Sequence, residues 1–251
     1  MSKIHRLFIE ISYDGTAYHG WQIQENSVSV QELVNQALST VLRQPVETVG
    51  CGRTDTGVHA KQLYAHFDIS EENIFENPQL IIRINSILPP HIAIKRIIEV
   101  PQNAHARFDA ISRSYEYHIH FNKDPFKHNL SWLLHTHPDV ELMNEAAKIL
   151  LSYQDFSCFS KSNTQTMTNN CTISKAEWVE ENNGLVFHIT ADRFLRNMVR
   201  AIVGTLLKVG KHEINPEEIR QIIESKNRSN AGVSVPACGL YLTKVVYKFP
   251  L

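Results

Sequence analysis

The sequence predicts an α+β fold made of two halves that divide near residues 100–110. Three observations support this prediction. Alternating strand patterns and helical patterns follow one another in both halves, and the connections between them are short. In addition, 251 residues with 43% hydrophobic and 20% charged side chains can build a substantial core, in one large domain or two modest ones.

The first half combines strand patterns with two helix starts. A helix is expected from Ser29, because Glu32 three residues later completes a capping box, and Pro45 marks its end. A second helix begins at Asn77-Pro78. In chain order, the predicted elements are strand 6–13, the helix from 29, strand 46–51, strand 63–67, helix 77–88 and strand 92–100.

The second half repeats this alternation. Gly210 is suited to the left-handed cap of a long helix, and Asn215-Pro216 has the pattern of a helix start. The turn Asn182-Asn183-Gly184 separates two expected strands. In chain order, the predicted elements are strand 114–121, helix 140–151, strands 173–180 and 185–191, helix 194–209, a helix from 215 and strand 240–247.

Several classes of protein are disfavoured by the sequence. No apolar stretch approaches the ~20 residues that cross a bilayer, and the N-terminus lacks the apolar region of a signal peptide. The four cysteines lie far apart without a C-x-x-C pair, which favours reduced thiols over a disulfide framework. We therefore expect a cytoplasmic protein without a membrane segment.

Positive charge is concentrated in one region of a chain whose net charge is −1. Residues 191–211 contain five basic side chains and one acidic one. On the predicted helix 194–209 the basic residues form one stripe, and this stripe could be either a solvated face or a phosphate-binding surface. Its members are Arg193, Arg196, Arg200, Lys208 and Lys211.

The segment Gly52-Arg53-Thr54-Asp55-Thr56-Gly57 places a carboxylate in a turn that glycines flank and a strand precedes. A carboxylate held there can act as a nucleophile or a base in a cleft. An aspartate in a turn can also simply bond the backbone N–H groups around it. Both interpretations are open on the chemistry of these residues alone.

Six ordered blocks of the chain resemble the TruA-type tRNA pseudouridine synthases. The segment 52–60 is similar to their GRTDAGVHA signature and differs at Thr56, where alanine is usual. The other blocks are Tyr13–Thr16 with Gly20–Gln22, Ala106–Phe108 with Arg113–Tyr117, Asp155–Ser157 with Phe159, Phe194–Gly204, and Gly239–Leu242. Together they span about 230 residues.

This resemblance implies a fold and a reaction. The fold is two ferredoxin-like (RRM-like) domains, 1–105 and 106–251, whose mainly antiparallel sheets join with the active-site cleft at the seam. The reaction is isomerisation of uridine to pseudouridine at positions 38, 39 and 40, in the anticodon stem-loop of tRNA. The family acts as a homodimer, so a homodimer is the expected assembly and tRNA the expected partner.

The resemblance also implies roles for single residues. Asp55 matches the catalytic aspartate, and Arg53 the arginine that helps to hold the flipped nucleotide. Tyr115 matches the tyrosine that stacks on the uracil, and Arg200 the basic residue that pairs with the aspartate. Leu240 lies in the block whose apolar side chains line the base pocket.

The remaining candidates are assigned from their residue type and their position along the chain. Arg193, Arg196 and Lys208 are candidates for contacts with RNA phosphates. His59 could contact RNA or make a structural hydrogen bond. Tyr117 shares a strand face with Tyr115 and is expected in the core.

The predicted reaction gains and loses no electrons or atoms, so we expect neither a metal nor a redox cofactor. Two rival functions remain. A non-catalytic tRNA-binding module would use the basic stripe without needing Asp55 as a carboxylate. A metal-dependent hydrolase would use the histidine pairs His118/His120 and His135/His137, but these lack a carboxylate or cysteine at a helpful spacing.

Overall fold

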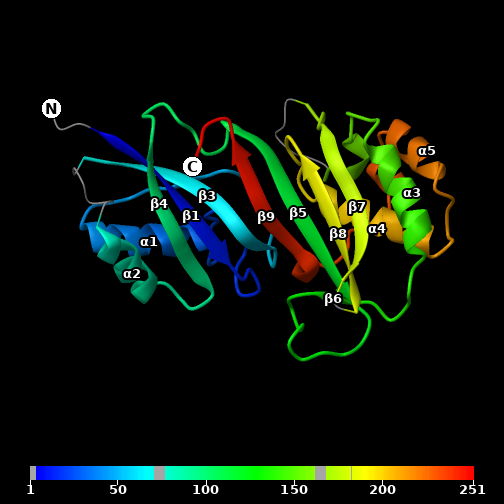
Figure 1. Ribbon diagram of the computed structural model, residues 1–251, viewed down its shortest axis with the longest axis horizontal. Helices are drawn as coiled ribbons and strands as arrows, with labels where there is room; N and C mark the ends of the chain where they lie inside the picture. The colour runs from blue at the N-terminus through cyan, green and yellow to red at the C-terminus, as the bar shows by residue number, and fades with distance from the viewer. Residues whose placement is uncertain (1–3, 71–76, 162–167, 182) are drawn as a thin grey trace. The chain divides into compact units, whose positions relative to one another are not determined.

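The computed structural model describes residues 4–70, 77–161, 168–181 and 183–251 (Figure 1). As predicted, the structure is mixed α+β and its strands pair mostly in antiparallel fashion. The chain forms two units. Unit 1 comprises Met1–Ile111 and Leu242–Leu251, and unit 2 comprises Ser112–Tyr241, so the end of the chain returns to the first unit.

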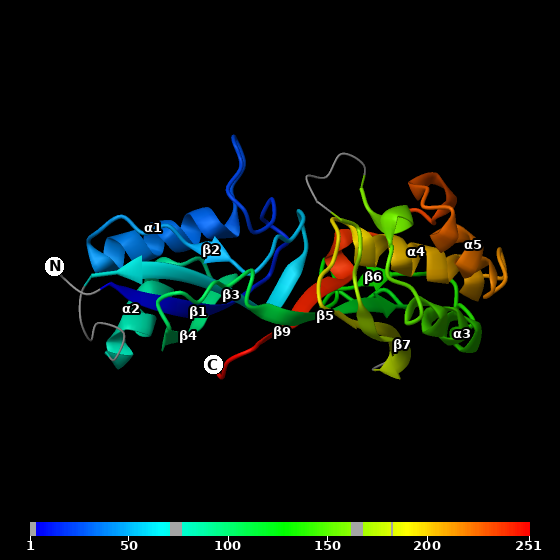
Figure 2. The same ribbon diagram turned by 90° about the horizontal axis from the view of Figure 1, so that it is seen from above.

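Unit 1 is a sheet that carries two helices. Strand β1 pairs antiparallel with both β3 and β4, and β2 pairs with β3. In Figure 2, α1 runs along one face of this sheet. The elements are β1 (His5–Tyr13), α1 (Val30–Leu42), β2 (Val49–Gly50), β3 (His59–Ile69), α2 (Pro78–Ile87), β4 (Ile92–Val100) and β9 (Leu240–Tyr247), most of which belongs to this unit.

The helix starts predicted in unit 1 are confirmed by their caps. The Ser29 side chain accepts the Glu32 N–H at 3.3 Å, and the Asn77 side chain accepts the Gln79 N–H at 2.9 Å. The strand expected over 46–51 is shorter, because side chains of α1 bond the backbone there. Asn35 Oδ1 accepts the N–H of Thr48, so this residue does not extend the ladder of β2.

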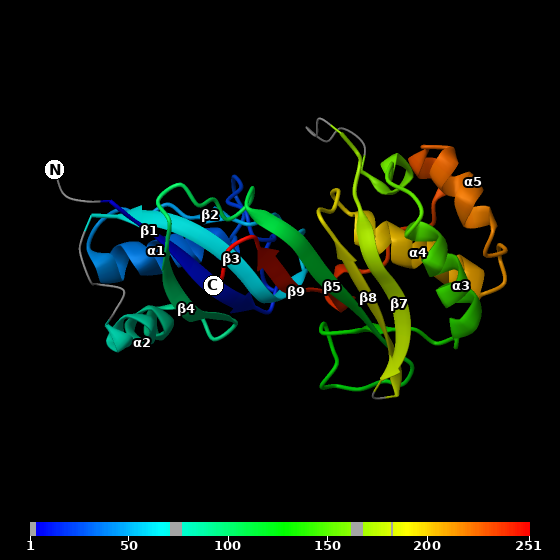
Figure 3. The same ribbon diagram turned by 45° about the horizontal axis from the view of Figure 1, so that its top comes forward.

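Unit 2 contains a sheet in which β5 pairs with β8 and β8 with β7. Figures 1 and 3 show its helices gathered beside β7 and β8. The elements are β5 (Ala110–His120), β6 (Trp132–Leu133), α3 (Val140–Leu150), β7 (Ile173–Glu181), β8 (Gly184–Ala191), α4 (Met198–Gly210) and α5 (Glu218–Glu224), with short 3₁₀ helices η2 (Ser157–Phe159), η3 (Arg228–Asn230) and η4 (Ala237–Gly239). Of the turn predicted between β7 and β8, Asn182 lies outside the described residues.

The prediction of the helix 194–209 was wrong at its start. Helix α4 begins at Met198, because Leu195 C=O and Met198 N–H close a turn and Asn197 has a left-handed φ of 66°. Arg193 and Arg196 therefore precede the helix and share no stripe with Arg200. The next α-helix starts at Glu218, because the residues before it form tighter turns in which Asn215 C=O accepts the Glu218 N–H and Pro216 C=O accepts the Ile219 N–H. The Glu218 side chain accepts the N–H of Asn215, the capping-box contact expected for Asn215 as the cap.

The basic stripe of α4, left open as a solvated face or a phosphate-binding surface, is partly covered by other residues of the chain. Gly204 lies on the same stripe as Arg200 and Lys208, and a Cβ at Gly204 would meet the carbonyl oxygen of Val233 at 1.8 Å. Thr205 on this helix is buried and its Oγ1 accepts the N–H of Gly232. The chain over residues 228–236, which we call the covering segment, thus packs on this face of α4.

The two units repeat one order of elements. In unit 1 the order is β1, α1, β2, β3 and α2, and in unit 2 it is β5, α3, β7, β8 and α4. In both, the first strand of the set pairs with the third, and the third pairs with the second. Unit 2 differs in having the short strand β6 between β5 and α3 and the 3₁₀ helix η2 between α3 and β7.

Candidate active site

Asp55 lies in unit 1, on the turn that joins β2 to β3. Its backbone C=O accepts the N–H of Val58 at 3.1 Å, and Gly57 between them has a φ of +75°, which favours glycine. The side chain of Asp55 is half-buried, and Arg53 beside it is exposed. The turn therefore presents a carboxylate and a guanidinium near the surface of the unit.

The chain just after β1 holds this turn, and we call residues 13–21 the clasp. The Tyr13 hydroxyl and Thr54 Oγ1 form a buried hydrogen bond of 2.7 Å. Gly20 has a φ of +88°, and a Cβ there would meet the Thr54 carbonyl oxygen at 2.2 Å. The residue before Asp55 is thus fixed both by a hydrogen bond and by close backbone packing.

The clasp also holds the residues that follow Asp55. A Cβ at Gly15 would meet the Val58 carbonyl oxygen at 2.0 Å, and the N–H of Gly57 donates to the carbonyl of Tyr18. His59 is buried, and its Nδ1 accepts the N–H of Gly15 at 3.1 Å. This hydrogen bond gives His59 a structural role, one of the two predicted for it.

The clasp carries a carboxylate of its own, Asp14. Burial alone would raise the pKa of Asp14. Hydrogen bonds from Thr16 and the charges of His59 and His91 outweigh burial, so that the pKa lies below its usual value. Sequence reasoning assigned no role to the clasp, although Gly15 and Gly20 were a signal for close backbone approach.

Tyr115 lies in unit 2, within β5 and opposite Ile189 of β8. Its half-buried ring meets Phe194 edge to face, with 5.1 Å between the ring centroids. Tyr117, two residues on, is fully buried and donates its hydroxyl proton to the Pro236 carbonyl. Burial raises the pKa of Tyr117, which confirms the prediction that this tyrosine belongs to the core.

Arg200 lies in the first turn of α4, where the covering segment holds it. Its Nε donates to the Val235 carbonyl at 2.7 Å, and the Val235 N–H donates to the Arg200 carbonyl at 3.2 Å. Within the covering segment, Ser234 Oγ accepts hydrogen bonds from Asn197 and Arg228. Arg228 and Asn197 therefore support the part of the covering segment to which Arg200 is bonded, and no sequence pattern predicted this role.

The remaining predicted residues are spread over unit 2. Leu240 is buried at the start of β9, and Lys208 is half-buried on α4. Arg196 is exposed, while Arg193 is half-buried beside Asp192, whose side chain accepts the Arg193 N–H.

Among the residues that the structure describes, no group of three or more His, Cys, Asp or Glu is placed to hold a metal ion. Cys51, beside the Asp55 turn, is buried, and burial raises the pKa of Cys158 and Cys171 to about 12. None of the helices in these same parts of the chain is long and apolar enough to cross a membrane.

The sequence was compared with known proteins. A family model described as tRNA pseudouridine synthase matches residues 146–248. The chain is 51% identical over 244 residues to tRNA pseudouridine synthase A of Porphyromonas gingivalis, covering 96% of this chain and 97% of that one. The identity is 47% over 246 residues to the Bacteroides fragilis protein of the same name, covering 98% and 97%. It is 39% over 241 residues to that of Clostridium acetobutylicum, covering 95% and 98%.

Identity at this level over nearly the whole length of each relative leaves no large part of the chain unmatched. The chain belongs to the tRNA pseudouridine synthase A family and is an isomerase that acts on tRNA.

Proposed function

We propose that this enzyme converts uridine to pseudouridine at positions 38, 39 and 40, in the anticodon stem-loop of tRNA, with Asp55 as the nucleophile. The observation that supports Asp55 is its turn, which the clasp fixes on both sides while the carboxylate stays half-buried. A nucleophile needs this combination of a rigid backbone and an accessible side chain.

The reaction rearranges bonds within one nucleotide. The bond between N1 and C1′ breaks, the freed uracil turns over, and C5 bonds to C1′. The proton on C5 leaves and N1 takes one up, so atoms and electrons balance. Asp55 adds to a carbon of the sugar or of the ring to open this path.

The other residues act on the same nucleotide in this proposal. Tyr115 stacks on the uracil, and its edge-to-face contact with Phe194 supports this role because it orients the ring. Arg200 pairs with the carboxylate of Asp55, and Arg53 holds the flipped nucleotide. Leu240 lines the base pocket, where an apolar wall excludes water.

The RNA backbone is bound by residues around this centre. Arg193, Arg196 and Lys208 are the proposed phosphate contacts, and the buried His59 supports the turn that presents Asp55 to the RNA. The assembly is a homodimer in the cytoplasm that binds one tRNA across both subunits. Each unit is proposed to be a ferredoxin-like domain, which the pairing of β1 with both β3 and β4, and of β2 with β3, supports in unit 1.

The experiment is to incubate unmodified tRNA with wild type and with Asp55→Asn, and then to map the pseudouridines. We expect product at positions 38, 39 and 40 with wild type. We expect turnover to fall by about 10⁴-fold or more in the variant, the scale of losing a nucleophile. Asp68→Asn is the matched control, since Asp68 in the same unit pairs with Arg6 and should leave turnover unchanged.

Two outcomes would contradict the proposal. Product formation by Asp55→Asn at the wild-type rate would show that Asp55 is not the nucleophile. If the wild-type protein binds tRNA but forms no pseudouridine, the non-catalytic tRNA-binding module is favoured instead.

A further inference from the structure

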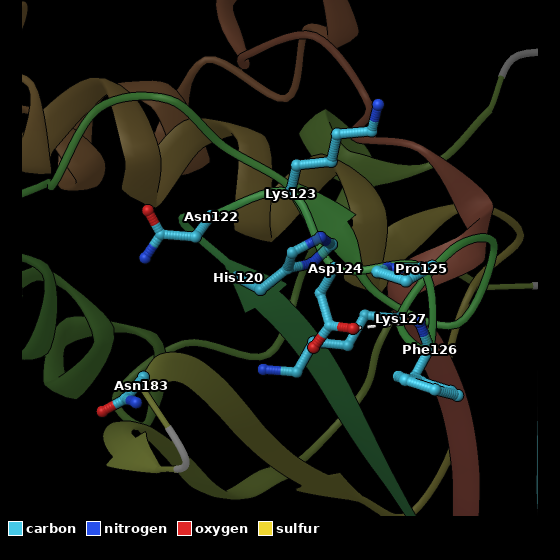
Figure 4. Close-up of a pocket in the computed structure, with 8 residues that line it drawn as sticks. All are labelled: His120, Asn122, Lys123, Asp124, Pro125, Phe126, Lys127 and Asn183. Atoms are coloured by element: carbon cyan, nitrogen blue, oxygen red, sulfur yellow. Dashed lines mark hydrogen bonds between the residues drawn. The ribbon is translucent and has the colours of Figure 1, made fainter.

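A cavity of about 400 Å³ opens in unit 2 where β5 ends (Figure 4). The loop that follows β5 forms most of its wall, and β6 closes the loop by pairing with Ile119 and His120. The residues that line the cavity are His120, Asn122, Lys123, Asp124, Pro125, Phe126, Lys127 and Asn183.

The loop is braced from within. Asp124 Oδ1 accepts the N–H of Phe126 at 2.9 Å, and the backbone C=O of Asp124 accepts the N–H of Lys127 at 3.1 Å. The carboxylate of Asp124 is therefore engaged with the backbone of its own turn. The side chains of Lys123 and Lys127 then supply the positive charge of the cavity wall.

Two side chains of the cavity wall are in unusual environments, one an exposed aromatic ring and the other a buried imidazole. Phe126 is 88% exposed, although burial of an aromatic ring is normally favourable. His120 is 5% exposed and its Nδ1 has no hydrogen-bond partner among the described residues. Burial lowers the pKa of His120 and the charge of Lys127 lowers it further, which keeps this ring neutral and able to accept or donate a hydrogen bond.

The cavity is separate from Tyr115. Four residues of β5 lie between Tyr115 and His120, so five residue steps, about 17 Å of extended chain, separate them, and their side chains point to opposite faces of the strand. A ligand in this cavity would therefore not occupy the place proposed for the target uracil.

We propose that this cavity is an accessory RNA site that takes one unpaired nucleotide of the substrate tRNA. Its phosphate lies beside Lys127, Lys123 on the other side of the loop adds to the positive potential, and its base stacks on the exposed face of Phe126. Lysines with an exposed aromatic ring form the usual combination for unpaired RNA. This proposal rests on tRNA being the substrate, as it is for the family. A chain of net charge −1 needs such local positive patches to hold a polyanion.

The first test measures how binding of full-length unmodified tRNA depends on NaCl concentration. In Lys123→Gln/Lys127→Gln we expect the slope of log K against log [salt] to become shallower by about 0.7–0.9, the contribution of the one phosphate that the site holds. We expect kcat at saturating tRNA to stay at the wild-type value. Lys148→Gln is the control, because this exposed lysine of α3 lies outside the cavity. A slope equal to that of wild type would overturn the proposal.

The second test separates stacking from charge. We expect Phe126→Leu to weaken tRNA binding about fivefold or more and Phe126→Trp to retain it, since only an aromatic ring stacks on a base. A blunt duplex RNA has no unpaired base, so Phe126→Leu should bind it as wild type does. Equal losses on tRNA and on duplex RNA, or a change only in the oligomeric state, would refute a site for an unpaired nucleotide. These binding measurements remain valid even if Asp55→Asn disproves the proposed chemistry.

Discussion

Unit 1 presents Asp55 on a turn between two strands, whereas unit 2 presents Tyr115 from within a strand and Arg200 from the first turn of a helix. The turn of Asp55 is held by the backbone of the clasp, through glycines that leave no room for a Cβ. Arg200 is held through its own side chain, which donates to the Val235 carbonyl.

This difference predicts different tolerance to substitution. A turn packed backbone against backbone cannot shift without losing its geometry. A long side chain bonded to a carbonyl can partly adjust when its support moves. The four predictions below use this contrast, from the largest expected effect to the smallest.

The largest effect is expected at Arg200. Arg200→Ala should abolish useful turnover, with a rate lower by about 10²–10³-fold or more, because the substitution removes the proposed charge partner of the nucleophile. Arg193→Ala should mainly weaken RNA affinity and its dependence on salt. The measurements are single-turnover rates and salt titrations of both variants. Equal and mild effects on turnover would refute this division.

A second prediction concerns the clasp. In Gly20→Ala the new Cβ would collide with the Thr54 carbonyl at 2.2 Å, and φ +88° would strain alanine. We expect kcat to fall about 100-fold, the cost of displacing a reacting group by about 1 Å, together with a lower Tm. In Gly52→Ala, which lies on the Asp55 turn and has no atom within 4 Å of its Cβ, the Tm should be unchanged. A normal kcat in Gly20→Ala would show that the clasp does not position Asp55.

A third prediction addresses the covering segment. Arg228→Ala should lower kcat about tenfold with little change in KM, because Ser234 loses a donor and the Val235 carbonyl that holds Arg200 becomes less fixed. Arg220→Ala is the control, since Arg220 is exposed and pairs with Glu217 outside this segment. A loss of stability without any change in kcat would make Arg228 purely structural.

The smallest effect is expected from His66 in unit 1. Burial lowers the pKa of His66 to about 4, and the charge of Arg6 contributes. Between about pH 6.5 and pH 4 the unfolded chain binds a proton that the folded chain does not, so stability falls as the pH falls through this window, by on the order of 2–3 kcal/mol.

The variant His66→Asn tests this assignment. Its side-chain oxygen can still accept the Ala106 N–H that His66 Nδ1 accepts, but it does not titrate. We expect denaturant unfolding of this variant to depend less on pH than wild type between pH 4 and 6.5. If the free energy of unfolding depends on pH in the same way for wild type and His66→Asn, the acid sensitivity comes from other groups.

Much of the fold followed from local patterns. Strands β4 and β9 begin and end at the predicted residues, and the capping side chains Ser29 and Asn77 mark helix starts because their signal is local. The start of α4 did not follow, because the turn before Met198 depends on a left-handed Asn197. The covering of α4 was missed because residues 228–236 have no periodic pattern that announces what they pack against.

The site shows the same limit. The Asp55 turn was recognisable from its flanking glycines and its neighbours in sequence. The clasp and the support of Arg200 were not, since both join residues that lie 35 or more positions apart. Such contacts depend on the packing of the whole unit rather than on any pattern along the chain.

The return of residues 242–251 to unit 1 has a consequence for how the protein is made. Tyr247 is buried there, packs edge to face on Phe8 and donates to the Ala106 carbonyl. A ribosome delivers the N-terminal part first, yet the core of unit 1 stays open until residues 242–251 have been made. Removal of residues 242–251 should therefore destabilise the unit whose synthesis begins first.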